Sequence, residues 1–401
     1  MPVSTPALVN PPLLAWAREE SGYAPEMAAR RLHVASERLL SWERGEAKPT
    51  VRQALALAKL YQRPLGVFFL PQAPTLPPLA SEYRRLLGVQ PGVESPELRL
   101  AIRVLSTRRE LAIQLSGELG VPVVEFATAV HLSESPIHAG QRLREALGIT
   151  IDEQFDWRDE WQAWREWRRA VENAGVLVGQ FPKVPLTEVR GVSLLHWPLP
   201  AIGINSKETS PGARSFTLIH ELTHIALARG NEEQVALRER RDETAWRQVE
   251  RFGEEVASTV LIPEEALSGF LDRMAVPRGG WDIPLVRRLA GTFRVTPLAM
   301  ATRLRAAGAL SWDGYRQWRE DWDRHVASIK PRASGFASPV DKALSRGGRP
   351  FAQLVLQALD ANRITSVDAS HYLGLRFDHV ENLRRELGRT ASRGGGDDDG
   401  E

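Results

Sequence analysis

The sequence predicts a mainly α-helical protein with a small β-sheet, and three observations favour this fold class. The chain has 401 residues, which is enough for two or three domains at about 100–200 residues each. Between residues 95 and 119, leucine and isoleucine recur at helical spacing. Residues 199–205 instead form a short apolar run of the kind expected for a strand. Helical segments around a few short strands are therefore expected.

The composition excludes several classes of protein. The chain is 43% hydrophobic and 25% charged, which is typical of globular proteins and excludes a fibrous or wholly disordered chain. It has no cysteine, so disulfides, thiol catalysis and Cys-ligated zinc are excluded. It contains no apolar run of about 18 residues and no secretion signal in residues 1–10, so we expect a cytoplasmic protein without a membrane span. The net charge is only +2, so any nucleic-acid surface must be local.

The N-terminal segment is expected to form short helices over residues 13–20, 25–32 and 37–44, with Ser36 capping the third and Gly45 ending it. Trp42 to Thr50 resembles the Xre/Cro-type helix-turn-helix family, and residues 54–60 and 64–69 fit its remaining helices. The resemblance implies that the third helix enters the major groove of DNA. The residues it places at DNA are Arg30, Arg31, Ser36, Arg38, Arg44 and Lys48.

A second interpretation of this segment stays open. The second helix begins Ala24-Pro25-Glu26 and lacks the Gln that commonly clamps a phosphate in this family. Glu37 at the reading end repels phosphate unless it accepts from a cytosine amino group. A module kept for homodimerisation, or for holding the rest of the chain, therefore remains an alternative to DNA binding.

Proline and glycine divide the whole chain into five expected segments. The helix-turn-helix segment is followed by a linker and helical region, a mixed helix and strand region, a helical module and an acidic tail without apolar residues, which is predicted to be disordered. Their bounds are residues 1–73, 74–150, 151–330, 331–393 and 394–401. No repeat of fixed period is visible. The helical module is expected to hold three short helices, one of them capped by Thr365 or Ser366.

Two further helices carry residues that are candidates for a surface or a core. Arg99, Arg103, Arg108 and Arg109 follow one another within residues 95–119, as a second nucleic-acid stripe or as a solvated helix face. Trp157, Trp161, Trp164 and Trp167 are spaced by three or four residues. That spacing favours packing in the core over a ligand cage.

His220-Glu221-Leu222-Thr223-His224 is the most informative pentapeptide. Two histidines four residues apart on a helix lie on one face, where both imidazoles can reach one metal ion. Glu221 between them is placed to take a proton from the attacking water. Apolar neighbours predict a buried helix that ends at Gly230. The alternative is a chance pentapeptide whose histidines serve the core.

A catalytic zinc site of this type needs a third ligand, and without cysteine it must be His, Asp or Glu. A second helix is expected over residues 242–261, and it carries Glu250 and Glu254 on one face, followed by Glu255. Spacing alone does not decide between Glu250 and Glu254. All three carboxylates could also form a solvated acidic face.

Residues 210–219 leading into the pentapeptide, together with Glu250 to Pro263, resemble the ImmA/IrrE family of metallo-endopeptidases. The resemblance implies a zincin-like α+β peptidase domain over residues 151–330, with Zn²⁺ bound by His220, His224 and Glu250. It implies Glu221 as the catalytic residue, while Glu254 stands where the family usually has Asn.

The resemblance also suggests where a substrate binds. Residues 199–205 precede the metal helix, as does the edge strand that pairs with an extended peptide in zincin-like peptidases. The groove is then expected along Ile202, Gly203 and Ile204, the alternative being an ordinary internal strand. The oxyanion-stabilising group stays undecided. Candidates, each also explained by a structural role, are His196, Tyr315 and His325.

Taken together, these features predict a cytoplasmic zinc endopeptidase fused to a helix-turn-helix. The resemblance implies a protein substrate, expected to be a transcriptional repressor or the chain itself, in a stress or DNA-damage response. We expect DNA to gate the site, because the basic clusters lie largely outside the catalytic core; they are Arg30-Arg31, Arg84-Arg85, Arg108-Arg109 and Arg384-Arg385. The alternatives are a DNA-binding regulator with a structural or vestigial metal site, and a toxin–antitoxin or immunity component.

Overall fold

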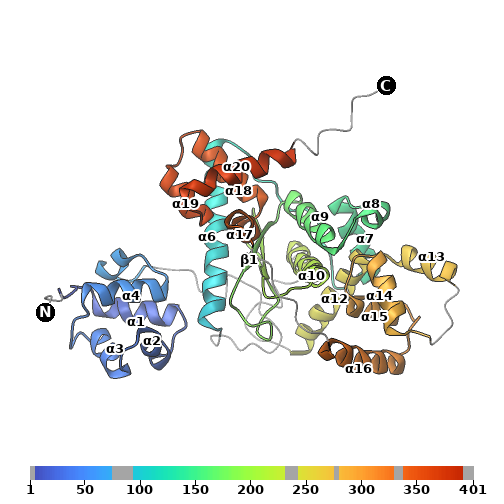
Figure 1. The fold of residues 1–401 in the computed structure, drawn as a ribbon, viewed down its shortest axis with the longest axis horizontal. Coiled ribbons are helices and arrows are strands. Elements are labelled where there is room, and N and C mark those ends of the chain that lie inside the picture. The colour runs from blue at the N-terminus through green and yellow to red at the C-terminus, as the bar shows by residue number, and fades with distance from the viewer. Residues whose placement is uncertain (1–4, 75–93, 231–242, 275–279, 329–336, 392–401) are drawn as a thin grey trace. The chain divides into compact units, whose positions relative to one another are not determined.

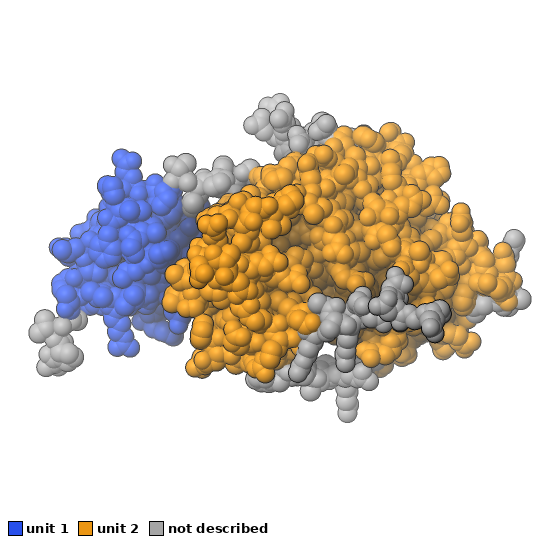
Figure 2. Space-filling model, turned by 90° about the horizontal axis from the view of Figure 1, so that it is seen from above, with its two compact units in different colours: residues 1–104 blue, residues 105–401 orange. Residues whose placement is uncertain are grey.

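The computed structural model describes residues 5–74, 94–230, 243–274, 280–328 and 337–391. The expected acidic tail, most of the proline-rich linker and Arg84-Arg85 lie outside the described residues. The chain divides into two compact units, residues 1–104 and residues 105–401 (Figure 2). The predicted fold class is confirmed, since helices dominate and three short strands form one sheet (Figure 1). No helix in the described residues is long and apolar enough to cross a membrane.

The first unit begins with four α-helices and a 3-10 helix: α1 (Pro11–Glu20), α2 (Pro25–Leu32), α3 (Ser36–Glu43), α4 (Val51–Tyr61) and η1 (Leu65–Phe69). Their buried side chains form one small core. The members that are almost inaccessible to solvent include Leu14, Leu39, Trp42, Leu57 and Phe68. A capping box at Thr50 and Gln53 begins α4.

The turn between α2 and α3 differs from expectation in one detail. His33 ends α2 in the left-handed conformation, with φ 56° and ψ 44°. Ser36 is not the N-cap of α3 but its first helical residue, because the Ala35 carbonyl already accepts hydrogen bonds from the amides of Arg38 and Leu39. The first turn of α3 therefore has no side-chain cap.

Helix α6 (Pro96–Leu119) matches the predicted helix and contains the boundary between the units. Its arginines form neither a solvated face nor a nucleic-acid stripe. Arg99 pairs with the Glu94 carboxylate at 3.2 Å, and Arg103 donates to the Tyr61 carbonyl. Arg108 donates to a carbonyl at residue 346, and Arg109 donates to carbonyls at residues 196, 197 and 199. Burial lowers the pKa of Arg103 and of Arg108 to about 10.

The sheet of the second unit has the strand order β1-β3-β2. Strand β3 (Ala201–Asn205) lies in the middle, parallel to β1 (Leu177–Phe181) and antiparallel to β2 (Gly191–Leu194). All residues of the three strands are buried, because both faces of the sheet are covered. On one face, a Cβ added to Gly179 or to Gly203 would lie 3.2 Å from the Leu105 side chain of α6. The opposite face packs against α10 (Pro211–Arg229) (Figure 1).

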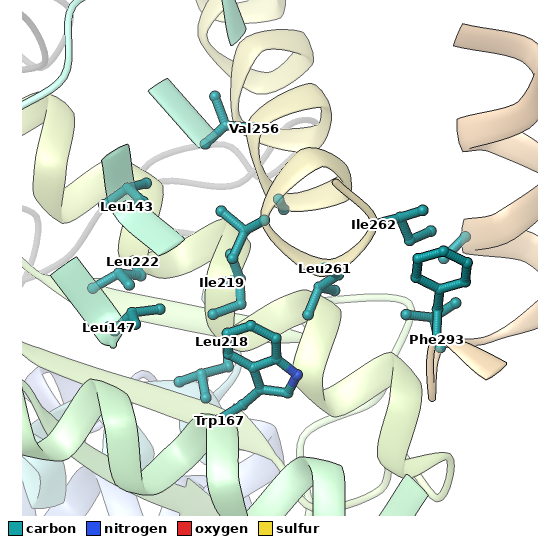
Figure 3. Close-up of a cluster of buried hydrophobic side chains, with 14 of the residues drawn as sticks. Leu143, Leu147, Trp167, Leu218, Ile219, Leu222, Val256, Leu261, Ile262 and Phe293 are labelled. Carbon is teal, nitrogen blue, oxygen red and sulfur yellow. The ribbon is translucent and has the colours of Figure 1, made fainter. Parts of the chain in front are cut away.

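Further helices pack around α10 and α12 or on one another: α7 (Pro136–Leu147), α8 (Ile151–Asp156), α9 (Glu160–Asn173), α12 (Glu243–Leu261), α13 (Glu264–Met274), α14 (Ile283–Thr292), α15 (Pro297–Ala306) and α16 (Trp312–Ser328). Their apolar faces meet α10 in the main core (Figure 3). Its labelled members include Leu143, Trp167, Ile219, Val256 and Phe293.

The tryptophan stripe is only partly a core feature. Trp164 and Trp167 of α9 are buried, but Trp161 is 46% exposed. Trp157 is buried, yet it follows the end of α8 and does not belong to α9. The stripe is broken because the chain makes a turn between α8 and α9, which equal spacing in the sequence does not reveal.

Four helices close the chain: α17 (Pro339–Gly347), α18 (Arg349–Asp360), α19 (Ser366–Leu373) and α20 (Phe377–Ala391). One more helix is present than expected, since α17 precedes the predicted three. Thr365 is the N-cap of α19 and forms a capping box with Asp368.

Candidate metal centre

Two helices bring three side chains with metal-binding atoms together. His220 and His224 lie one turn apart on α10, and Glu250 comes from α12, which packs against α10. Their ligand atoms all lie within 4.8 Å of one another. The two Nε2 atoms are 3.1 Å apart, and His220 Nε2 is 3.4 Å from Glu250 Oε2.

These distances fit a tetrahedral ion. Ligand atoms bound at about 2.0–2.1 Å in tetrahedral geometry are about 3.3 Å from one another. The Nε2–Nε2 distance of 3.1 Å and the Nε2–Oε2 distance of 3.4 Å lie close to this value. Two imidazoles and one carboxylate are also the donor set of a class of zinc sites with three protein ligands. The residues present therefore fit a metal ion.

The side chains of the centre differ in how far they are exposed to solvent. His224 is fully buried and Glu221 is 2% exposed. The His220 and Glu250 side chains are 13% and 18% exposed. A ligand approaching from solvent would therefore meet His220 and Glu250 first, while Glu221 is kept in a water-poor environment.

A glycine on α12 leaves room for both imidazoles. A Cβ added to Gly253 would lie 3.1 Å from His220 Cε1 and 3.2 Å from His224 Nε2. Those separations are shorter than ordinary contacts between carbon atoms. A glycine inside a helix weakens it by about 1 kcal/mol relative to alanine. Its presence in an otherwise regular helical pattern was the available signal in the sequence, although it does not identify the neighbour.

Glu221 lies against the backbone of β2. A Cβ added to Gly191 would lie 2.8 Å from Glu221 Cγ, 2.9 Å from its Oε1 and 2.6 Å from Thr217 Cγ2. The Glu221 carboxylate therefore occupies the space above the α carbon of Gly191, between α10 and the strand. No pattern in the sequence singles out Gly191.

Glu254 follows Glu250 by one turn but does not belong to the group of three. Burial raises the pKa of the Glu254 carboxyl, and the neighbouring Glu255 raises it further, while Arg251 and Arg305 lower it. The structure thus brings Glu250, and not Glu254, to the two histidines.

The end of α12 is held by side chains from three distant parts of the chain. Arg144 donates to the Val260 carbonyl at 2.6 Å, and Gln154 donates to the next carbonyl, at residue 261, at 3.0 Å. Arg303 donates to the carbonyl of the residue after that, Ile262, at 3.0 Å. The last carbonyls of a helix have no partners within the helix. These three bonds supply partners and fix the helix that carries Glu250.

The expected groove residues are placed differently from the prediction. Ile202, Gly203 and Ile204 are in β3, which is hydrogen-bonded to a strand on each side, and an extended peptide cannot pair there. The prediction of an edge strand at residues 199–205 is therefore wrong. Strand order depends on contacts with distant segments, and the run of apolar residues does not encode it. The antiparallel edge strand beside α10 is β2.

The three candidates for oxyanion stabilisation lie in separate surroundings. Tyr315 of α16 has its hydroxyl 3.3 Å from Thr302 Oγ1, and the ring of His325 packs 5.6 Å from that of Trp322. The His196 carbonyl accepts from Arg109. The side-chain contacts give Tyr315 and His325 a structural role, whereas the bond at His196 is made by its main chain.

The residues expected at DNA lie on or next to α2 and α3. Arg30, Arg38 and Lys48 are exposed. Arg31 is exposed as well and pairs with Glu97 at 3.3 Å. Arg44 pairs with Glu46 at 2.6 Å, a bond that lowers the pKa of the Glu46 carboxyl. Ser36 is half-buried at the start of α3.

Comparison with known protein families gives two matches. Residues 172–305 match the IrrE N-terminal-like domain family, and residues 14–68 match a helix-turn-helix family. The first match contains both helices of the candidate metal centre, and the second contains α2 and α3. Comparison with curated proteins and with solved structures gives no significant match.

Proposed function

We propose that this chain, which carries an IrrE-like metallopeptidase domain and a helix-turn-helix domain, is a zinc-dependent endopeptidase acting on a protein substrate. The observation that carries the proposal is the convergence of His220, His224 and Glu250, with the buried Glu221 beside them. A purely structural metal site has no use for a carboxylate between its two histidines.

In this proposal His220, His224 and Glu250 hold the zinc ion. Bound zinc would supply Lewis-acid chemistry, polarising the scissile carbonyl and easing ionisation of the attacking water. Glu221 accepts the proton from that water and returns it to the leaving amine as the C–N bond breaks. Its burial keeps competing water away, and its position between α10 and β2 fixes the direction in which it can accept.

We infer that the substrate lies along β2 and not along β3. The Asn205 amide donates to the Arg190 carbonyl across the antiparallel pair, so residues 190, 192 and 194 bond toward β3. The main-chain groups of Gly191 and Ser193 consequently face the free edge of the sheet. An extended peptide pairing with them would pass beside Glu221, since Gly191 touches that side chain.

The substrate class follows from the helix-turn-helix in the same chain. We propose a transcriptional repressor of similar fold, or the chain itself, as substrate, within a stress or DNA-damage response. Gating by DNA would act through the helix-turn-helix module. Arg108 and Arg109 are bonded to main-chain carbonyls, and Arg384 pairs with Asp360, so these residues do not form free basic clusters.

We also propose that residues 14–68 bind duplex DNA with α3 in the major groove. Arg38 and Arg30 are exposed, as phosphate contacts require. Replacing Arg38 with alanine should lower the slope of log affinity against log salt by about one unit. An unchanged slope in R38A, with binding intact, would contradict the assignment of Arg38.

The test of the enzyme proposal uses the purified full chain. Metal analysis should find about one zinc per chain, and the protein should cleave a purified helix-turn-helix repressor encoded beside it. The variant Glu221→Gln should keep the metal and lose cleavage. Cleavage by Glu221→Gln at the wild-type rate would overturn the role of Glu221. Bound metal and DNA binding without cleavage of the repressor or of the chain would support a regulator with a structural metal site instead.

A further inference from the structure

The C-terminal helices α19 and α20 repeat the geometry of α2 and α3. Each pair consists of a helix of 8 residues, a three-residue turn and a second helix. Each first helix ends in a residue with left-handed backbone, His33 at φ 56° and ψ 44°, and Gly374 at φ 60° and ψ 35°. The next amide in each turn bonds back to the carbonyl five residues earlier at 3.0 Å.

Three of the buried positions in the two pairs also correspond. Because His33 and Gly374 end the first helix of their pairs, adding 341 to a residue number in the first pair gives the equivalent residue in the second. Ala28 then corresponds to Ala369, and both are fully buried. In the second helices Leu39 matches Val380 and Trp42 matches Leu383, whereas buried Ala29 of the first pair corresponds to Ser370, which is only half-buried.

An ion pair between the first and third helices recurs with its charges exchanged. In the first module, Arg18 of α1 pairs with Glu43 of α3 at 2.8 Å. In the second, Asp360 of α18 pairs with Arg384 of α20 at 2.6 Å. Arg384 is the counterpart of Glu43 under the same correspondence, whereas Asp360 is the counterpart of Glu19 and the second pair is more exposed than the first. The two modules therefore agree in their turn, in part of their core and in an ion pair to the third helix, which makes α18, α19 and α20 a second helix-turn-helix with one residue more between its first two helices.

The charge on the second module resembles that on the first. Residues 25–48 contain five basic and four acidic side chains, and residues 366–389 contain four of each together with two histidines. Net charge therefore gives no reason to assign the two modules to different kinds of partner. Arg376 in the turn is 83% exposed and pairs with Asp378 at 3.6 Å, and Arg385, the counterpart of Arg44, is exposed and donates to Asn382 Oδ1 at 2.5 Å, as Arg44 pairs with Glu46 in the first module.

The start of α20 carries side chains suited to reading base edges. Phe377 is 57% exposed at the first position of the helix, where it can contact a thymine methyl. Asn382, the counterpart of Ser41, is exposed five residues after Phe377, and its side-chain amide can pair with adenine. Asp378 corresponds to Glu37 and can accept from a cytosine amino group.

We propose that residues 349–391 are a second duplex-DNA-binding module, with α20 as its reading helix and Arg376 and Arg385 as phosphate contacts. The chain then presents two reading helices, α3 and α20. Each module contributes phosphate contacts of its own, so the salt dependence of the full chain reflects both.

The experiment measures binding of the full chain to a 40-base-pair duplex of mixed sequence across a range of salt concentrations. The variant Arg376→Ala/Arg385→Ala should lower the salt slope by about two units and weaken binding by about tenfold or more at low salt. The matched control is Arg316→Ala/Arg319→Ala on α16, which removes two exposed arginines of the same unit. It should change neither quantity.

A variant of the first module distinguishes the contributions of the two modules to DNA binding. The variant Arg30→Ala/Arg31→Ala/Arg38→Ala disables the first module's contacts. It should keep residual binding, which Arg376→Ala/Arg385→Ala then removes. Complete loss of binding in the first-module variant would overturn the second module's role while leaving the first intact. Equal binding by Arg376→Ala/Arg385→Ala and its control would overturn the proposal too. Loss of self-association in that variant, with DNA binding unchanged, would assign the face to a protein partner instead.

Discussion

Replacing Gly191 with alanine should disable the proposed general base without removing the metal. The added methyl would lie 2.8 Å from Glu221 Cγ and 2.9 Å from Oε1, whereas ordinary carbon contacts need about 3.5–4.0 Å. The strand cannot retreat, because β2 is paired with β3 and packed on α10. Thr217, whose Cγ2 would lie 2.6 Å from the methyl, and Glu221 must therefore both shift, Glu221 by about 1 Å.

A displacement of that size has a calculable effect on rate. Misplacing a catalytic group by about 1 Å reduces the rate by about 10²-fold. The three atoms nearest to the methyl of Gly191→Ala belong to Thr217 and Glu221 and not to His220, His224 or Glu250. We therefore expect kcat to fall about 10²-fold, with KM and zinc content unchanged. The assay follows cleavage of the repressor substrate, with metal content measured on the same preparation.

Two other glycines supply the controls. Gly291→Ala on α14 adds a methyl that meets nothing within 4 Å, and it should leave kcat unchanged. Gly253→Ala places its methyl 3.1–3.2 Å from both imidazoles, so it should lower metal affinity before it affects any other step. A wild-type kcat in Gly191→Ala would refute the argument that this glycine sets the position of Glu221.

Three further predictions concern the ligand, the end of α12 and the first unit. Glu250→Gln should lose zinc more severely than Glu254→Gln, measured by metal titration, and equal loss would sink the assignment of Glu250. Arg144→Met leaves buried carbonyls without a donor, so the free energy of unfolding should fall by about 3 kcal/mol in urea titrations, against a small change for the exposed Arg319→Met. Burial raises the pKa of the Tyr61 hydroxyl above its unfolded value of about 10, so the folded state loses stability as the pH rises beyond 10 and the phenol must ionise. Tyr61→Phe should reduce this loss of unfolding free energy at alkaline pH. The same pH dependence in Tyr61→Phe and in the wild type would contradict the prediction.

Local patterns in the sequence predicted local structure well. Periodic leucines placed a helix over residues 95–119, and the structure has it over Pro96–Leu119. The pentapeptide at residues 220–224 lies on a buried helix, as its apolar neighbours indicated. The choice of Glu250 over Glu254 came from a family resemblance, because both lie on one helix face and only the packing of α12 on α10 separates them.

Features that depend on distant contacts could not be predicted. The position of β3 between two strands reversed the expectation for Ile202 and its neighbours. Arg109 looked like a surface charge, yet it is bonded to main-chain carbonyls almost ninety residues away. The second helix-turn-helix was missed for a related reason. Its core uses Val380 and Leu383 where the first uses Leu39 and Trp42, so the two copies share a pattern of burial and little sequence.

The three bonds that hold the end of α12 also set an order of events during synthesis. A growing chain contains His220, His224 and Glu250 well before it contains Arg303, the last of the three donors. At about 5–20 residues per second, the ribosome needs ~3–10 s to pass from the final ligand to that arginine. During this interval Arg144 and Gln154 are already present to bond the carbonyls of residues 260 and 261, while the Ile262 carbonyl still lacks its donor. The helix that carries Glu250 therefore gains its full set of end bonds only about fifty residues after the last metal-binding side chain has been made.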